Sequence, residues 1–327
     1  MAFMGVHIAF GVLDSANTIG DYSLFTGLAG QLWISISMFS SSILQIYDNK
    51  LKIENIKKLD FFKHRVADNG TTDLLEIKRI SFENVSFTYP GTTVPALSNI
   101  NLSLYKNEKV VLVGLNGSGK STLIKLLLRM YDPDTGVIRI NNLDIKEYKL
   151  HELRANFSVY FQEMHNYNFT LRENFTLADD GQDEAMLEPA LIAASGSDIL
   201  KKATKGMATS LSRLYDQEGL ELSRGQHQKL ALARVLYRRH TALILDEPSS
   251  NLDPKAEHEI FNTLTELSKD KMTIFTSHRL SNVSLADRIL VLEKGQVVED
   301  GTQEELLKSE TRYAKLFRYQ KEKYVNA

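Results

Sequence analysis

The sequence predicts an α/β domain with a largely parallel sheet, preceded by one or two membrane-spanning helices. Two observations predict this fold class. From about Glu76 onward, short apolar runs alternate with amphipathic segments, a pattern typical of parallel strands joined by helices. Before that point, residues 1–49 contain no lysine or arginine, and cationic residues follow at once. This charge pattern is typical of a membrane segment that ends on the cytoplasmic side.

The composition is that of a folded protein. The 327 residues are enough for about two domains with a sizeable core. Hydrophobic residues make up 43% and charged residues 24%, which indicates a globular chain. The formal net charge of −2 gives no basic signal for nucleic acid, so no nucleic-acid partner is predicted. The lack of cysteine excludes disulfides and thiolate metal sites within this chain.

The uncharged run of residues 22–47, "YSLFTGLAGQLWISISMFSSSILQIY", is the candidate membrane span. A span needs about 20 residues, and the serines and glutamines of this run suit a helix packed among other helices. Buried helices of a soluble protein are the alternative for residues 1–47. Residues 1–13 lack the basic start and the cleavage site of a signal peptide. Cationic residues follow the span and place its end in the cytoplasm: Lys50, Lys52, Lys57, Lys58, Lys63 and Arg65.

Apolar periodicity predicts the elements of the α/β region. Helices are expected at 121–131 and at 254–270, where the second has its apolar residues on one face. Strands are expected at 80–91, 109–114, 241–248 and 272–278, and hairpins at 136–145 and 288–301.

The strongest chemical signal is "GLNGSGKST", residues 114–122. It fits the pattern G-x-x-x-x-G-K-[ST] and lies between an apolar strand and a helix. The glycines let the backbone wrap around phosphate oxygens, and the helix start adds N–H groups and a favourable dipole. Lys120 brings positive charge to the β- and γ-phosphates, and Ser121 offers a hydroxyl to Mg²⁺. The alternative is a glycine turn before an ordinary helix. The predicted ATP-binding residues are Gly114, Asn116, Gly117, Ser118, Gly119, Lys120, Ser121 and Thr122.

The second signal is "LILDEP", residues 243–248, in which two acids end a buried strand. Beside a phosphate loop, Asp246 is expected to hold Mg²⁺, usually through water, and Glu247 to orient the attacking water. The alternative is that the two acids only cap the strand and begin a turn.

Together with five more motifs in order, these segments resemble the nucleotide-binding domain of ATP-binding-cassette (ABC) transporters. The resemblance covers about residues 76–310. It implies a P-loop NTPase fold with a RecA-like core, an antiparallel β-subdomain and an α-helical signature subdomain, with ATP and Mg²⁺ as cofactors. The motifs are Tyr89 in "FTYPG", Gln162 in "VYFQE", "LSRGQ" with Ser223, Gly225 and Gln226, Asp253 in "SNLD", and His278 in "TSHR".

The resemblance assigns a role to each of these positions. Tyr89 stacks on adenine, and Gln162 joins Mg²⁺ and the attacking water. His278 contacts the γ-phosphate, and Asp253 lies in the D-loop. Each has a structural alternative: a strand-edge tyrosine, an exposed turn glutamine, or a histidine that only follows a strand.

By the same resemblance, the "LSRGQ" turn is expected to contact the γ-phosphate held by a second subunit, so that Lys120 of one subunit and Ser223 of the other close on one ATP. A capping box formed by Ser223 and Gln226 also explains the helix start by itself. Arg224 stands where the commonest family form, "LSGGQ", has glycine. Its Cβ costs energy if the backbone needs a positive φ, and its guanidinium strengthens nucleotide-dependent closure if it lies beside the triphosphate.

The front of the chain resembles the last transmembrane helix of exporter-type ABC proteins. The predicted boundaries are 1–65 for the end of the transmembrane domain and its cytosolic extension, 66–75 for a linker, 76–316 for the ATP-binding domain and 317–327 for a tail. A complete exporter half has several more membrane helices, so the chain looks like a truncated half-transporter. The alternatives are a chain that starts late and a transporter whose remaining helices are on another polypeptide.

The predicted function is that of an ATP-binding and ATP-hydrolysing subunit of an ABC exporter for a lipid, peptide or drug-like substrate. Its predicted partners are a second nucleotide-binding domain, in a homo- or heterodimer, and transmembrane helices. The predicted location is the plasma membrane, with the ATPase domain on the cytoplasmic side. The alternatives are a non-transport ABC ATPase and an ATP-binding regulatory subunit.

Overall fold

The computed structural model describes most of the chain in two compact units, Met1–His64 and Arg65–Ala327. Each unit is described by itself. The described residues are 6–7, 10–11, 18–60, 66–161, 167–177, 183–214, 216–246, 270–276, 280–308 and 310–325.

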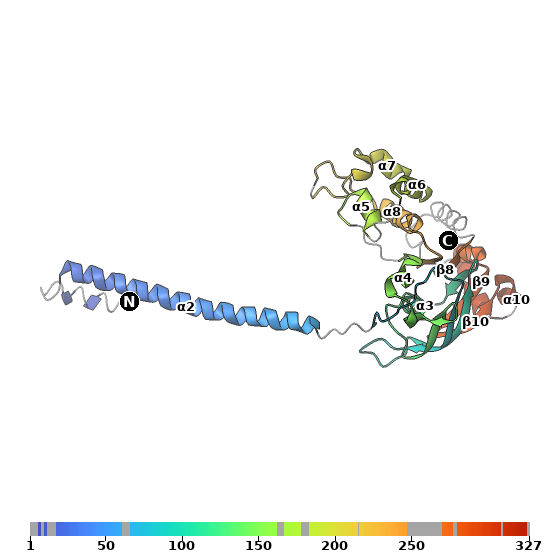
Figure 1. The fold of residues 1–327 in the computed structure, drawn as a ribbon, viewed down its shortest axis with the longest axis horizontal. Coiled ribbons are helices and arrows are strands. Elements are labelled where there is room, and N and C mark those ends of the chain that lie inside the picture. Colours follow the sequence, from blue (N-terminus) through green and yellow to red (C-terminus); the bar gives the residue numbers. More distant parts are fainter. Residues whose placement is uncertain are drawn as a thin grey trace. The chain divides into compact units, whose positions relative to one another are not determined.

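The first unit is dominated by one long helix, α2, Ile19–Asp60 (Figure 1). Thr18 and Asp21 form a capping arrangement, in which the Thr18 N–H donates to Asp21 Oδ2 across 2.9 Å and the Asp21 N–H donates to Thr18 Oγ1 across 3.2 Å. Within the described residues, α2 is the one helix long and apolar enough to cross a membrane, judged by length and composition. It contains the whole predicted span of residues 22–47.

The second unit contains ten strands within the described residues. Helices of the same unit connect or flank them. The strands are β1 Arg79–Phe87, β2 Leu97–Tyr105, β3 Lys109–Val113, β4 Thr135–Ile140, β5 Leu143–Asp144, β6 Phe157–Tyr160, β7 Ala242–Leu245, β8 Met272–Thr276, β9 Arg288–Glu293 and β10 Gln296–Gly301. The α-helices are α3 Lys120–Leu127, α4 Leu150–Ala155, α5 Leu171–Thr176, α6 Leu187–Ala193, α7 Ser197–Lys202, α8 Arg224–Tyr237, α10 Gln303–Lys308 and α11 Arg312–Val325. Short 3₁₀ helices lie at η1 Ile145–Glu147, η2 Glu184–Met186, η3 Gly206–Ala208 and η4 Leu280–Leu285.

The strands form two sheets. The smaller sheet has the order β2-β1-β4-β5 and is antiparallel. The larger has the order β10-β9-β3-β8-β7-β6, and its strands from β9 to β6 are parallel. The expected α/β class with a largely parallel sheet is therefore confirmed, as are the hairpin pairings β4–β5 and β9–β10.

The parallel strands are buried on both faces, which explains why they are mostly apolar. In β3, Val110 and Leu112 belong to one core cluster, whereas Val111 and Val113 belong to another. The two sides of a strand alternate, so each strand contributes to both clusters. This packing holds the carboxyl ends of β3, β7 and β8 side by side.

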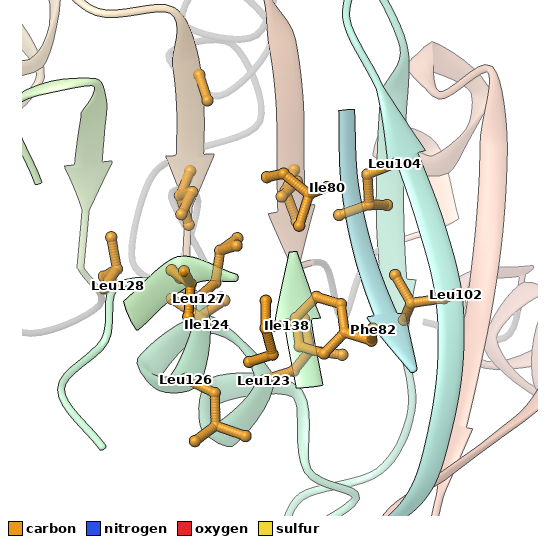
Figure 2. Close-up of a cluster of buried hydrophobic side chains, with 14 of the residues drawn as sticks. Ile80, Phe82, Leu102, Leu104, Leu123, Ile124, Leu126, Leu127, Leu128 and Ile138 are labelled. Carbon is orange, nitrogen blue, oxygen red and sulfur yellow. The ribbon is translucent and has the colours of Figure 1, made fainter. Parts of the chain in front are cut away.

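The first cluster surrounds α3 (Figure 2). Leu123, Ile124 and Leu127 of α3 lie among side chains of the small sheet, including Phe82 of β1 and Ile138 of β4. The second cluster joins the other face of the parallel sheet to α5, α6, α8 and α11. The helix that follows the phosphate loop is thus held in place by apolar packing.

The expected helix at 121–131 is too long at its C-terminal end. Helix α3 ends at Leu127 because Arg129 has a left-handed φ of 48°. The Met130 N–H donates to Lys125 O and the Arg129 N–H to Leu126 O, each across 2.9 Å, which is the Schellman pattern with arginine in place of the usual glycine. The predicted helix at 254–270 lies outside the described residues except for Asp270.

Candidate nucleotide-binding site

The phosphate loop follows β3 at the centre of the parallel sheet and leads into α3. Gly119, the N-cap of α3, has a φ of 109°, which glycine adopts without steric cost. A Cβ at Gly114 would lie 2.4 Å from Leu292 O and 2.6 Å from Ser118 Oγ. The loop therefore passes β9 too closely for any side chain at Gly114, and its path depends on both glycines.

Lys120 extends its ammonium group into this loop. Its Nζ donates to Gly114 O across 2.8 Å and to Leu115 O across 3.2 Å, and only 6% of the residue is exposed. A positive charge thus lies beside the N-terminal end of α3. Charge, dipole and N–H groups together favour an anion here.

A cavity of about 420 Å³ adjoins the first half of the loop. Residues 114–118 form one wall, and residues 291–294 together with residues of α11, including Leu316 and Tyr319, form the rest. Within the described part of the chain, neither Tyr89 nor Thr122 lines this cavity. It is therefore distinct from the surface where Tyr89 meets α3.

Asp246 comes directly after β7, two strands away from β3 in the sheet. Only 8% of it is exposed. Its Oδ1 accepts a hydrogen bond from Thr276 Oγ1 across 2.8 Å, and its N–H donates to Tyr160 O across 2.8 Å. A buried carboxylate, oriented by a neighbouring strand, thus lies at the same edge of the sheet as the phosphate loop.

Tyr89 lies two residues beyond β1 and reaches α3. Its hydroxyl is 3.2 Å from Thr122 Oγ1, and its ring makes edge contacts with Phe87 and Tyr131 at centroid distances of 5.0 and 5.4 Å. Lys125 Nζ lies 5.5 Å from the ring centroid. The ring is therefore held next to the second residue after Lys120, on the antiparallel side of the domain.

The "LSRGQ" turn forms a complete capping box at the start of α8. The Gln226 N–H donates to Ser223 Oγ across 3.3 Å, and the Ser223 N–H donates to Gln226 Oε1 across 3.0 Å. The predicted capping box is thus confirmed. The Ser223 bonds of the box stay within this turn, whereas the Gln226 amide also reaches Asp198 of α7. Among the described residues, these bonds join the turn to no residue of the phosphate loop.

Arg224 and Gly225 have ordinary helical surroundings. Arg224 is the first residue of α8, is exposed and does not have a positive φ. The backbone cost considered for its Cβ is therefore absent. Gly225 also lacks a positive φ, and a Cβ there would meet no atom within 4 Å. Nothing among the described residues requires glycine at position 225.

Four predicted site residues, Gln162, Glu247, Asp253 and His278, lie outside the described residues. Two further residues reach the candidate site without having been predicted. Thr276 is the last residue of β8, and Asp198 accepts from Gln226 Nε2 across 2.8 Å. The place of Thr276, two residues before His278, was a usable signal. Asp198 precedes Gln226 by 28 residues and matches no pattern that the sequence displays.

The arrangement defines an ATP-binding P-loop domain, and comparison with known proteins specifies it further. Residues 97–250 match the family model described as ABC transporter, so this part of the chain is an ABC transporter domain. Its relatives are ABC exporters. The chain is 40% identical over 288 residues to the subtilin transport ATP-binding protein SpaT of Bacillus subtilis, an alignment that covers 88% of this chain and 47% of that protein.

Other relatives have the same relation to the chain. The ATP-dependent lipid A-core flippase of Escherichia coli (strain K12) is 40% identical over 257 residues, covering 78% of this chain and 42% of the flippase. A solved structure of a bacterial Atm1-family ABC exporter with ATP bound has a TM-score of 0.76 and 29% identity, covering 93% of this chain and 53% of that chain. The chain thus spans about half the length of the proteins it matches.

Proposed function

We propose that the chain is the ATP-hydrolysing part of an ABC exporter, and that ATP-driven association with a second nucleotide-binding domain powers transport. One observation carries the proposal: the Lys120 loop lies at the carboxyl edge of the parallel sheet, where Asp246 is also held. In open parallel sheets, ligands bind at this edge.

The phosphate loop, Lys120 and Tyr89 each have a proposed part in holding ATP. N–H groups of the loop and of the first turn of α3 receive the phosphates, Lys120 neutralises them, and the Tyr89 ring takes adenine. Ser118 supports this assignment, because its Oγ is buried and has no hydrogen-bond partner among the described residues. A phosphate oxygen would supply that partner.

The residues also fit Mg²⁺. Within the described residues there is no cluster of three or more histidine or acidic side chains. Mg²⁺ does not need such a cluster, since it binds through one or two protein ligands together with substrate phosphates and water. Asp246 and the Ser121 hydroxyl would hold the ion, with Gln162 as a further ligand. When bound, Mg²⁺ offsets negative charge on the transferred phosphoryl group.

Association of two subunits follows from where the ATP contacts lie. The Lys120 loop and the Ser223 turn are separate surfaces of one chain, and we propose that a γ-phosphate joins them between two chains. ATP favours the closed pair because its γ-phosphate contacts both surfaces only there, and a ligand shifts an equilibrium only by its differential affinity. Hydrolysis removes that bridge, so the pair opens and moves the attached membrane helices.

Membrane attachment is proposed from α2 and from the cationic residues that follow its apolar part. The same charge pattern supports a cytoplasmic location for the ATPase domain at the plasma membrane. The remaining helices of the transport path would belong to a preceding segment or to another chain. A lipid, peptide or drug-like substrate is consistent with relatives named for subtilin transport and for flipping of lipid A-core.

The decisive test is ATP turnover by the full chain in detergent, compared with Glu247→Gln. We expect the variant to retain nucleotide binding and to lose about 10²-fold or more in turnover, because an acid or base group contributes at least that much. Glu188→Gln, an exposed position on α6, makes the same charge change away from the site. Equal turnover of the wild type and Glu247→Gln would refute the catalytic assignment.

A membrane fractionation separates transport from the alternatives. Extraction only by detergent supports the exporter, whereas release by alkaline carbonate supports a non-transport ABC ATPase. Nucleotide binding without turnover in the wild type would support the regulatory subunit.

A further inference from the structure

The Gln226 side chain is buried and uses both ends of its amide. It is 5% exposed. Its Oε1 accepts from the Ser223 N–H across 3.0 Å, and its Nε2 donates to Asp198 Oδ2 across 2.8 Å. A carboxylate only accepts hydrogen bonds when it is ionised. Asp198 therefore determines which end of the amide faces Ser223, and with it the geometry of the capping box.

Asp198 remains charged in this position. Burial raises the pKa of its carboxyl, but hydrogen bonds from Gln226 and Lys229 outweigh burial and bring the pKa below its usual value. The second oxygen, Oδ1, accepts from Lys229 Nζ across 3.0 Å. Both donors come from α8, whereas Asp198 lies in the first turn of α7.

The Lys229 ammonium neutralises the charge of Asp198 near the N-terminus of α8. A lone carboxylate near the N-terminus of α8 would oppose an anion at the same helix end. The paired ammonium cancels most of that field beyond the pair itself, so Asp198 can orient Gln226 without repelling a phosphate. The pair therefore orients the Gln226 amide and adds no net charge near this helix end.

We propose that Asp198 is a positioning residue that holds the Ser223–Gln226 turn in the geometry that receives the γ-phosphate of ATP bound to the partner subunit. The inference rests on the proposed function for the identity of that ligand. It assigns no contact between Asp198 and ATP. Asp198 acts through Gln226, and Lys229 acts as its counter-charge.

The test compares two double variants of the full chain in detergent, Asp198→Asn/Lys229→Gln and Asp198→Ala/Lys229→Gln. Both remove the two charges, and they differ in whether position 198 offers an acceptor to Gln226. In the first, the side-chain oxygen introduced by Asp198→Asn accepts from Gln226 Nε2. Its amide group pairs with the side chain introduced by Lys229→Gln. In the second, Gln226 loses its acceptor.

We expect the alanine double variant to raise the KM for ATP on the order of 10-fold, because it removes a charge-assisted hydrogen bond from a buried amide. The asparagine double variant should stay within about 3-fold of wild type. Binding of a fluorescent ADP analogue at the Lys120 loop should be unchanged in both. Equal KM values for the two double variants, or a loss of ADP binding in the alanine variant, would overturn the assignment.

Amide hydrogen exchange provides a readout that does not depend on turnover. Without nucleotide, the alanine double variant should exchange faster than the asparagine variant at residues 223–227, where the capping box protects the first turn. Unchanged exchange would refute the positioning role even if ATP is hydrolysed. Faster exchange in a protein whose wild type does not hydrolyse ATP would leave Asp198 as a positioning residue and refute the proposed function instead.

Discussion

The Thr276 hydroxyl donates a hydrogen bond to Asp246 Oδ1 across 2.8 Å, which joins the last residue of β8 to the first residue after β7. Thr276 has no exposed surface. Because β7 and β8 are neighbouring parallel strands, this bond fixes the rotamer of the acid at the edge where ATP is proposed to bind. A hydrogen bond of this kind orients a carboxylate that holds a metal ion.

Thr276→Val should therefore weaken the response to Mg²⁺ while preserving shape. We expect the Mg²⁺ concentration for half-maximal ATP turnover to rise about 10-fold, the lower end of what loss of such a partner costs. Thr276→Ser keeps the hydroxyl and should stay within about 2-fold. A titration of ATPase activity against Mg²⁺ measures both, and equal behaviour of the valine and serine variants would contradict the role of the hydroxyl.

Tyr89 should contribute through its ring rather than its hydroxyl. Tyr89→Ala is expected to weaken ATP binding about 10-fold, since stacking of a base on an aromatic ring contributes about 1–3 kcal/mol. Tyr89→Phe, held by the same edge contacts with Phe87 and Tyr131, should bind nearly as wild type. The control is competition by inorganic tripolyphosphate, which has no base. If tripolyphosphate binding falls as much as ATP binding, the adenine assignment is wrong.

Gly225 should show opposite effects on stability and function. It lies near the start of α8 with open space around its Cα, so alanine fits within the chain. Gly225→Ala should raise the free energy of unfolding by about 0.5–1 kcal/mol, because alanine loses less backbone entropy in a helix.

The same substitution should lower ATP turnover if the partner's phosphate approaches this backbone closely. Urea unfolding and turnover of one preparation measure the two effects. A variant that gains stability and keeps full turnover would show that nothing comes close to Gly225. Arg224→Gly tests the neighbouring position, and an unchanged nucleotide dependence of association would show that Arg224 is only tolerated there.

His240 should make stability depend on pH. Burial, with the nearby Lys271 cation, lowers the pKa of His240 from 6.5 to about 4. Its Nδ1 lies 2.6 Å from Arg238 O, which only accepts, so Nδ1 carries the proton and Nε2 accepts from Lys271 Nζ across 3.2 Å. A proton added at Nε2 would place an N–H donor opposite the Lys271 ammonium, which is also a donor.

The unfolded chain therefore binds more protons than the folded chain between pH 6.5 and about pH 4. Stability is full above that window and falls with acidification by up to about 1.4 kcal/mol per pH unit. His240→Gln keeps an acceptor for Lys271 but does not titrate, so it should lose less stability than wild type between pH 7 and pH 5, a range chosen around the histidine's usual pKa. Parallel acid dependence of the two proteins in urea unfolding would contradict this account.

The sequence by itself determined the class of the fold and the position of the phosphate loop. Apolar stretches such as residues 110–113 have no polar face, and this predicts burial on both sides in a parallel sheet. The loop motif is local in the chain, so residue spacing alone was enough to single out Gly114, Lys120 and Ser121. The capping box is local for the same reason, because Ser223 and Gln226 lie within one helical turn.

Only the tertiary structure decided the relationships between distant segments. The bond from Thr276 to Asp246 exists because β7 and β8 pair, and the bond from Gln226 to Asp198 exists because α7 and α8 belong to one packed cluster. Strand pairing and helix packing are set by the burial of whole apolar faces, so no single residue signals them. The early end of α3 at Leu127 has the same cause, since Arg129 adopts a left-handed φ in which its buried guanidinium donates to Ala67 O across 2.7 Å.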